Sequence, residues 1–318
     1  MNEAVLQTTP KAAVRGNASS RLPGESQRSV SREMASPKGN NYTNPSRASP
    51  IGGLVELAVF KIQKPVGHPK RQFCRRQSEM TLFELERYEA KVYSQNGEDG
   101  LLAKIFDVLG ATNRFFVEFG TGSDGSERNT RLLEERHGWR GLLMDVCAEE
   151  NHPRVRKEKI TADNVNDLFA KYDVPDEFDL LSIDIDGNDY WVRKAIDSRY
   201  RPRVLVMEYN ASFAPPARKT IAYDENFRWN QTDYFGASLA ALESLNRQKG
   251  YTLVYCERRG INSFYIRSDL LPENSRKPVE EIYRAADYAR GKFFGLGRLY
   301  WPRGRGYRRE VNLKMIDV

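Results

Sequence analysis

The sequence has few of the residues that build disulfide frameworks, zinc sites or membrane anchors. Its 318 residues include only three cysteines and three histidines. Cys74, Cys147 and Cys256 lie far apart without a CxxC pair, which argues against both disulfides and a structural zinc site. No apolar run approaches the ~18 residues that span a bilayer, and the N-terminus lacks the hydrophobic core of a secretory signal. We therefore expect a cytoplasmic protein without a transmembrane segment.

Large apolar side chains are also scarce in the first fifty residues, which are rich in Ser, Pro, Asn and Arg. Such a composition cannot offset the entropy of ordering the chain. Counting Lys and Arg against Asp and Glu, the net charge is +7 for residues 1–92, −5 for 93–269 and +5 for 270–318. These contrasts predict a mostly disordered basic extension at 1–88, an α/β domain at 89–272 and a basic, aromatic C-terminal extension at 273–318.

The C-terminal stretch 290–309 interleaves Arg with aromatic residues. This composition can grip nucleic acid or an anionic membrane surface. A basic patch alone is weak evidence for such partners, so a solvated tail whose aromatic rings pack back on the domain is the preferred interpretation.

Between residues 93 and 269 the hydrophobic pattern alternates between the periods of strands and helices. Short, continuously apolar strands alternating with helices predict an α/β fold with a mostly parallel sheet, helices on both faces and a C-terminal antiparallel hairpin. The expected strands are 115–119, 141–145, 159–161, 178–185, 203–208, 251–256 and 262–266, and the expected helices are 99–109, 126–136, 164–172 and 237–249.

Acidic residues stand at the carboxyl ends of four of these strands. In parallel sheets this edge binds ligands where the strand order reverses. The carboxylates are therefore expected to converge on one rim, and they are Glu118, Asp145, Asp184, Asp186 and Glu208.

The first of these ends runs into a glycine loop. Gly120, Gly122 and Gly125 satisfy GxGxxG, and Asp145 follows about twenty residues later, as in dinucleotide-binding folds. An NAD(P)-dependent oxidoreductase is therefore one candidate. However, Glu118 would repel a pyrophosphate on the following turn.

S-adenosylmethionine, which carries cationic groups and no phosphate, suits this loop better. Glu118 would attract its ammonium group, and Gly120 and Gly122 would let the backbone approach it. Asp145 would accept hydrogen bonds from its ribose. Two further polar residues, Asp163 and Asn164, follow the expected third strand and would contact its adenine.

Five segments, in this order, resemble the FkbM-type methyltransferases, a branch of the class I S-adenosylmethionine-dependent enzymes. The resemblance covers roughly residues 93–269, and it implies a Rossmann-like methyltransferase fold and methyl transfer to an oxygen, often on a sugar-like acceptor. The chain departs from the family in its long basic ends and in Asp186, where many members carry another acid. The segments are YSQNGED at 93–99, VEFGTGSDG at 117–125, GLLMDV at 141–146, SIDIDGNDYW at 182–191 and VLVMEYN at 204–210.

Methyl transfer to a hydroxyl requires that the hydroxyl oxygen and the methyl group are aligned and that the hydroxyl proton is removed. Because no histidine lies in these motifs, the catalytic candidates are Asp186 and Asp184. Asp184, Glu208 and Asn210 would also make an all-oxygen magnesium site. Since such oxygen sets are common without a metal, a metal-free site is preferred.

Four side chains are candidates for acceptor binding: Glu208, Asn210, Trp229 and Tyr234. An aromatic ring beside polar groups suits a small-molecule or glycan acceptor, although Trp229 and Tyr234 could equally be loop packing. Gln95 and Glu98 suit either a lid over the cofactor or the cap of the following helix. A non-catalytic binding module with basic tails is a further alternative.

Overall fold

The computed structural model describes residues 84–126, 128–288 and 307–318. The chain divides into two units, residues 1–60 and 61–318, and every described residue belongs to the second. The predicted N-terminal extension thus lies almost entirely outside the described residues. In the ranges that are described, no helix is both long enough and apolar enough to cross a membrane.

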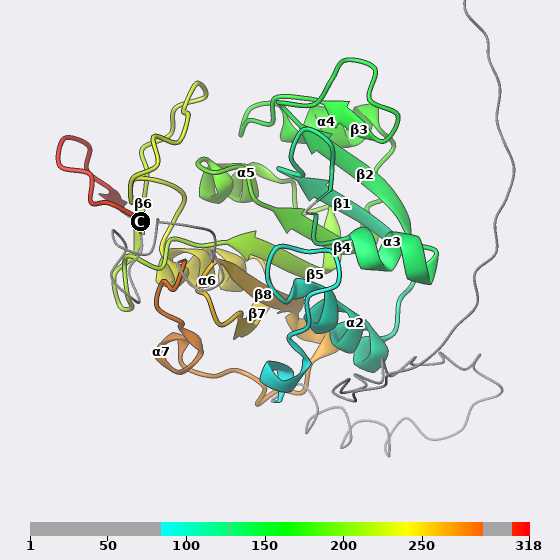
Figure 1. Cartoon of the computed structure of the whole chain (residues 1–318). Helices are drawn as coiled ribbons and strands as arrows, with labels where there is room; N and C mark the ends of the chain where they lie inside the picture. Colours follow the sequence, from blue (N-terminus) through cyan, green and yellow to red (C-terminus); the bar gives the residue numbers. More distant parts are fainter. Residues whose placement is uncertain (1–83, 127, 289–306) are drawn as a thin grey trace, which may run out of the picture. The chain divides into compact units, whose positions relative to one another are not determined.

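Seven strands form one sheet in the order β3-β2-β1-β4-β5-β8-β7 (Figure 1). The first five pair in parallel, and β8 runs antiparallel to both β5 and β7. This is the doubly wound order, reversing direction beside β1, with an antiparallel strand inserted near one edge. The predicted Rossmann-like methyltransferase fold is confirmed. The strands are β1 (Phe115–Phe119), β2 (Arg140–Asp145), β3 (Val155–Lys157), β4 (Glu177–Ile183), β5 (Arg201–Glu208), β7 (Tyr251–Cys256) and β8 (Asn262–Arg267).

Helices cover both faces of the sheet. Successive residues of a strand point to opposite faces, so neighbouring residues pack against different helices. Phe116 packs in a cluster with residues of α2 (Glu98–Leu109) and α3 (Arg131–His137). Val117 packs in the other cluster, with α4 (Val165–Lys171), α5 (Asp189–Ala195) and α6 (Leu239–Gln248). The smaller elements are the 3-10 helices η1 (Leu85–Tyr88) and η2 (Ser268–Leu270), helix α7 (Val279–Ile282) and a two-stranded sheet of β6 (Lys219–Thr220) and β9 (Ile316–Asp317).

Two expected elements are corrected. The third strand is Val155–Lys157, not 159–161, because the chain turns away after Lys157 and Asn164 Oδ1 accepts a hydrogen bond from the Thr161 backbone N–H. The helix expected at 126–136 begins only at Arg131, because the backbone N–H groups of Asn129 and Thr130 donate hydrogen bonds to the Glu118 carboxylate.

Segments on both sides of the predicted domain also contribute to it. Leu85 is 1% exposed and belongs to the core cluster on the α2 side. After residue 272, Ile282 is buried in the other cluster, and Tyr283 donates a hydrogen bond to the Ala211 carbonyl at 2.6 Å. The packed domain therefore extends beyond the limits of 89 and 272.

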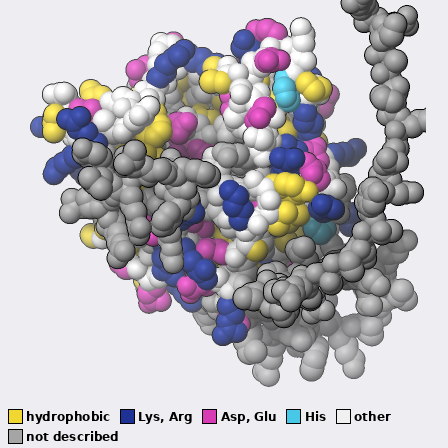
Figure 2. All heavy atoms as spheres, viewed as in Figure 1, with side chains coloured by type: hydrophobic (Ala, Val, Ile, Leu, Met, Phe, Trp, Pro, Cys, Tyr) yellow, Lys and Arg dark blue, Asp and Glu magenta, His cyan; other side chains and the backbone are white. Residues whose placement is uncertain are grey.

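The described surface that is visible in Figure 2 carries charges of both signs. On the face drawn in Figure 2, Lys and Arg side chains lie among Asp and Glu side chains and form no single large basic patch. Most of the basic stretch 290–309 lies outside the described residues, so the preferred solvated tail and the alternative of contacts with nucleic acid or an anionic surface both remain predictions.

Candidate functional site

The glycine loop brings the ends of β1 and β4 into direct contact. Gly120 has a φ of +70°, and a Cβ atom there would lie 1.4 Å from the Asp184 carbonyl oxygen. Only glycine allows both this conformation and this approach. The first residue of the loop is therefore required by its contact with the chain that leaves β4.

Asp145 fastens the same loop to the end of β2. Its Oδ2 accepts a hydrogen bond from the Gly122 backbone N–H at 2.9 Å, and its Oδ1 accepts one from the Cys147 backbone N–H at 2.6 Å. Asp145, which was predicted to contact the ribose, thus holds the glycine loop through its side chain. The ribose contact itself stays a prediction.

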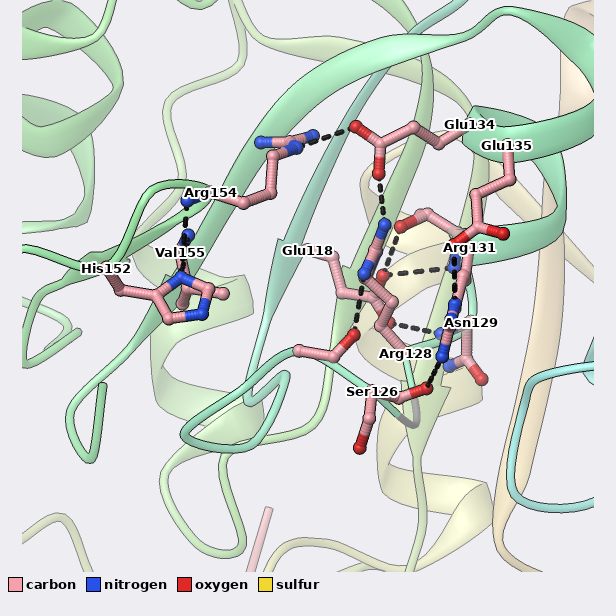
Figure 3. A network of polar contacts seen from close by, with 12 residues as sticks. Glu118, Ser126, Arg128, Asn129, Arg131, Glu134, Glu135, His152, Arg154 and Val155 are labelled. Atoms are coloured by element: carbon pink, nitrogen blue, oxygen red, sulfur yellow. Dashed lines mark hydrogen bonds and ion pairs between the residues drawn. The ribbon is translucent and has the colours of Figure 1, made fainter. Parts of the chain in front are cut away.

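Glu118 lies in β1, and its carboxylate turns toward the residues before α3 (Figure 3). Oε1 accepts a hydrogen bond from the Asn129 backbone N–H at 2.7 Å. Oε2 accepts bonds from the Thr130 N–H at 3.0 Å and its Oγ1 at 2.5 Å. Burial raises the pKa of Glu118, and these hydrogen bonds oppose the rise. Both carboxylate oxygens of Glu118 thus accept hydrogen bonds from the protein itself. Attraction of the cofactor's ammonium group by Glu118 remains a prediction.

A polar network continues outward from this loop (Figure 3). The Arg128 guanidinium donates to the Gly125 carbonyl at 2.6 Å and pairs with Glu134. Glu134 also pairs with Arg154 at 2.6 Å. The network ties the loop to α3 and to the chain entering β3, so its backbone is held in place before any ligand binds.

Three carboxylates meet at the ends of β4 and β5. One carboxylate oxygen from each of Asp184, Asp186 and Glu208 lies within 4.8 Å of the other two. Asp186 has a φ of +56° in a turn closed by Asp189, whose oxygens accept hydrogen bonds from the backbone N–H groups of Ile185 and Gly187 at 2.9 Å each. Asp189 therefore holds the turn that presents Asp186.

Crowding of like charges makes ionisation of this cluster costly. Burial raises the pKa of Asp184 well above its ordinary value, and the charge of Asp186 adds to the rise. Burial, followed by the charge of Asp184, does the same for Glu208. Burial and the charge of Asp189 raise the pKa of Asp186 to about 6. The cluster favours protons or a cation.

The cluster suits two kinds of chemistry. A carboxylate with a pKa near 6 can accept a proton from a hydroxyl at neutral pH. Three crowded carboxylates can also hold a hard divalent cation, and the Oε2 atom of Glu208 is buried without a hydrogen-bond partner among the described residues. The sequence alone identifies two of these carboxylates as metal candidates, Asp184 and Glu208, and the structure adds Asp186.

Asn210 does not join them. Its side chain is fully buried, its amide donates hydrogen bonds to the carbonyls of Asp233 and Phe235, and its Oδ1 accepts one from the Ser212 N–H. The predicted metal set of Asp184, Glu208 and Asn210 is therefore corrected. The amide that was expected to bind a metal or an acceptor instead fastens the loop after β5.

The residues predicted to contact adenine have partners of their own. Asp163 accepts a hydrogen bond from the Tyr223 hydroxyl at 2.8 Å. The Asn164 amide accepts one from the Thr161 N–H and donates one to the Lys159 carbonyl, each at 2.8 Å. Asn164 thus stabilises the turn before α4, and an adenine contact remains a prediction.

The two aromatic candidates differ in their surroundings. Tyr234 is 8% exposed and packs edge to face with Phe227. The Trp229 ring contacts Phe235 and also Tyr307, whose ring centroid lies 4.5 Å away. No residue of 307–318 was predicted as an acceptor-site candidate, yet Tyr307 packs against the candidate Trp229. The sequence does show aromatic residues between 290 and 309, but their position relative to the sheet could not be predicted from it.

The SQNGED motif closes the turn before α2. The Oδ2 atom of Asp99 accepts hydrogen bonds from the backbone N–H groups of residues 92–94. Glu98 accepts them from Asn96 and from Asn262 at the start of β8. Glu98 thus ties this turn to β8, whereas Gly97, which precedes α2, provides no side-chain cap for the helix.

No protein-family model and no curated protein sequence matches the chain. Among solved structures, it is similar to an S-adenosylmethionine-dependent methyltransferase from Clostridium acetobutylicum, with 11% identity over 52% of this chain and 88% of the other and a TM-score of 0.31. It is also similar to an O-methyltransferase family protein from Burkholderia thailandensis, with 10% identity over 62% and 69% and a TM-score of 0.29. Likeness at this level leaves the function open.

Proposed function

We propose that the chain is an S-adenosylmethionine-dependent methyltransferase that methylates a hydroxyl oxygen of a small, sugar-like acceptor. The observation that carries this proposal is the position of the carboxylate cluster. Asp184, Asp186 and Glu208 gather at the ends of β4 and β5, and Asp184 touches the glycine loop that follows β1. A cofactor site and a proton acceptor would thus share one rim of the sheet.

The cofactor side would consist of Gly120, Gly122 and Asp145, with Asp163 and Asn164 near the adenine. Asp145 can still accept a hydrogen bond from a ribose hydroxyl, because each carboxylate oxygen has more than one lone pair. Glu118 would contribute to cofactor binding indirectly, because it holds the backbone of the residues that follow the glycine loop. S-adenosylmethionine, when bound, would supply an activated methyl group.

On the acceptor side, Asp186 would take the hydroxyl proton as the oxygen bonds to the methyl group and the bond from methyl to sulfur breaks, which would leave S-adenosylhomocysteine. Asp184 would orient the acceptor with Glu208. The raised pKa values mean that these two carboxyl groups readily hold a proton, so either can donate a hydrogen bond to the acceptor. Alignment of the two reacting atoms would supply much of the acceleration.

A divalent cation such as Mg²⁺ is the alternative occupant of the cluster. Asp184, Asp186 and Glu208 would then ligate it, and it would lower the pKa of the acceptor hydroxyl. The metal-free form is preferred because oxygen ligands at strand ends are common without a metal.

Calorimetry tests the cofactor directly. The purified chain should bind S-adenosylmethionine and S-adenosylhomocysteine but not NADH, because the acidic rim repels a pyrophosphate. Titrations with and without Mg²⁺ should agree. Binding of NADH alone would favour the oxidoreductase instead, and binding of none of the three would favour a non-catalytic module.

A further inference from the structure

The C-terminal segment 307–318 is fastened to the loop that follows β5. The Asp233 N–H donates to the Arg308 carbonyl at 2.9 Å, and the Glu310 N–H donates to Asp233 Oδ1 at 2.7 Å. Further along, β9 pairs with β6, and Lys219 forms an ion pair with Asp317 at 2.7 Å. The segment is thus held at two points.

This attachment places Tyr307 at the centre of an aromatic cluster. Its ring centroid lies 4.5 Å from that of Trp229, 4.7 Å from Tyr288 and 5.6 Å from Phe235. The Tyr288 ring is tilted by only 33° from that of Tyr307, whereas Trp229 and Phe235 meet it edge to face. Three separate parts of the chain therefore build one aromatic wall, which we define as Trp229, Phe235, Tyr288 and Tyr307.

Asn210, two residues after Glu208, donates hydrogen bonds to the carbonyls of Asp233 and Phe235, which places the aromatic wall at the β5 end of the carboxylate cluster. The charges of Glu208, Asp186 and Asp184 all act on the Tyr307 hydroxyl and, after burial, raise its pKa to about 12. Burial, followed by the charge of Glu208, also raises the pKa of Tyr288, whose buried hydroxyl has no hydrogen-bond partner among the described residues. Two phenol groups are thus within electrostatic reach of the proposed reaction centre.

Aromatic faces beside carboxylates suit one kind of acceptor. A hydroxylated ring can place its C–H face against an aromatic ring while its hydroxyl groups donate hydrogen bonds to the carboxylates. Tyr307 is the member of the wall that contacts all three others, so removal of its ring would open the wall most.

We propose that segment 307–318 completes the acceptor side of the site and that Tyr307 determines which acceptors bind by stacking on their ring. This inference rests on the proposed function, because it takes the carboxylate cluster as the reaction centre. It adds a specificity-determining residue from a part of the chain that lies outside the methyltransferase-like motifs of the sequence.

The test uses the full chain saturated with S-adenosylhomocysteine and a panel of neutral methyl pyranosides as probes. Saturation-transfer NMR measures their binding to the wild type and to three variants. Tyr307→Leu keeps apolar bulk but loses the aromatic face, and Tyr307→Phe keeps the face. Val311→Ala is the matched control in the same segment, because Val311 is 78% exposed.

Tyr307→Leu should weaken pyranoside binding about tenfold, the ratio that corresponds to roughly 1.4 kcal/mol, while Tyr307→Phe and Val311→Ala bind like the wild type. Calorimetry with S-adenosylhomocysteine should give the same affinity for all four proteins. Equal pyranoside binding by Tyr307→Leu, or no pyranoside binding by the wild type, would overturn the proposal. If the wild type does not bind S-adenosylhomocysteine, the result would instead count against the proposed function.

Discussion

The Glu118 carboxylate receives two hydrogen bonds from Thr130, one from the backbone N–H at 3.0 Å and one from Oγ1 at 2.5 Å. The buried acid in the glycine-loop motif therefore holds the residues that lead into α3. Any contribution it makes to cofactor binding would include the geometry of this loop.

Replacement of Glu118 should therefore affect stability and binding together. Glu118→Gln keeps the shape but presents an NH₂ group to a backbone N–H. This unsatisfied pair should lower the free energy of unfolding by roughly 1 to 3 kcal/mol and weaken S-adenosylhomocysteine binding. Thermal melts and calorimetry measure the two effects. Glu135→Gln, which alters an exposed ion pair with Arg131, is the control. Unchanged stability and affinity in Glu118→Gln would contradict this role.

Gly120 and Gly138 provide a matched pair for the close approach at Asp184. Both have a φ near +70°, but a Cβ atom at Gly138 would meet nothing within 4 Å, whereas at Gly120 it would overlap the Asp184 carbonyl. Gly138→Ala should cost only the left-handed strain of about 1 to 2 kcal/mol. Gly120→Ala should cost clearly more and also abolish cofactor binding. Similar melting temperatures for the two variants would refute the contact.

Asp186 should make stability and turnover depend on pH in opposite directions. Its pKa is raised from 3.8 to about 6, so between these values the folded state binds more protons than the unfolded state. The free energy of unfolding therefore falls as pH rises through this window. Asp186→Asn, which suits the left-handed backbone, should match the wild type below pH 4 and be more stable above pH 6.

Turnover should rise with pH through about 6, as the general base ionises, and Asp186→Asn should lower it ~100-fold to 10,000-fold without loss of cofactor affinity. Methyl transfer from labelled S-adenosylmethionine measures this rate. Asp173→Asn is the control, because Asp173 also has a positive φ, of 51°, and is exposed on the turn after α4. Full turnover in Asp186→Asn would show that this carboxylate is structural.

Asp184 distinguishes the metal-free site from the metal site. In the metal-free form, EDTA leaves wild-type turnover unchanged, and Asp184→Asn gains no activity from added Mg²⁺. If a metal is present, EDTA abolishes turnover, and the variant needs a much higher Mg²⁺ concentration. Isothermal titration of the wild type with Mg²⁺ alone provides a readout that needs no acceptor.

Two N-terminal truncations test where the folded domain begins. Removal of residues 1–83 should change the melting temperature little, because this stretch belongs to the extension that is predicted to be mostly disordered. Removal of residues 1–88 also deletes Leu85, whose side chain is 1% exposed. Loss of such a buried side chain costs about 1.5 to 3 kcal/mol, so the longer truncation should melt several degrees lower. Equal melting temperatures would place the boundary after η1.

The local pattern of the sequence was sufficient for most of the sheet. Continuous apolar runs predicted β1, β2, β4, β5 and the β7–β8 hairpin, because a strand buried on both faces consists mainly of apolar side chains. The acids at their ends followed from the same pattern, because parallel strands end at one edge. Hence Asp184, Asp186 and Glu208 could be expected on one rim before the structure was known.

The tertiary structure decided how these side chains are used. Glu118 and Asn210 lie at positions that their motifs assign to ligands, yet both bond to loops of their own chain. Hydrogen-bond partners far apart in sequence leave no local periodicity, so these roles could not be predicted. Tyr307 packs against Trp229 because Asp233 and the pairing of β9 with β6 fasten segment 307–318 to the loop after β5. That pairing has two residues on each strand and is too short to produce a sequence pattern.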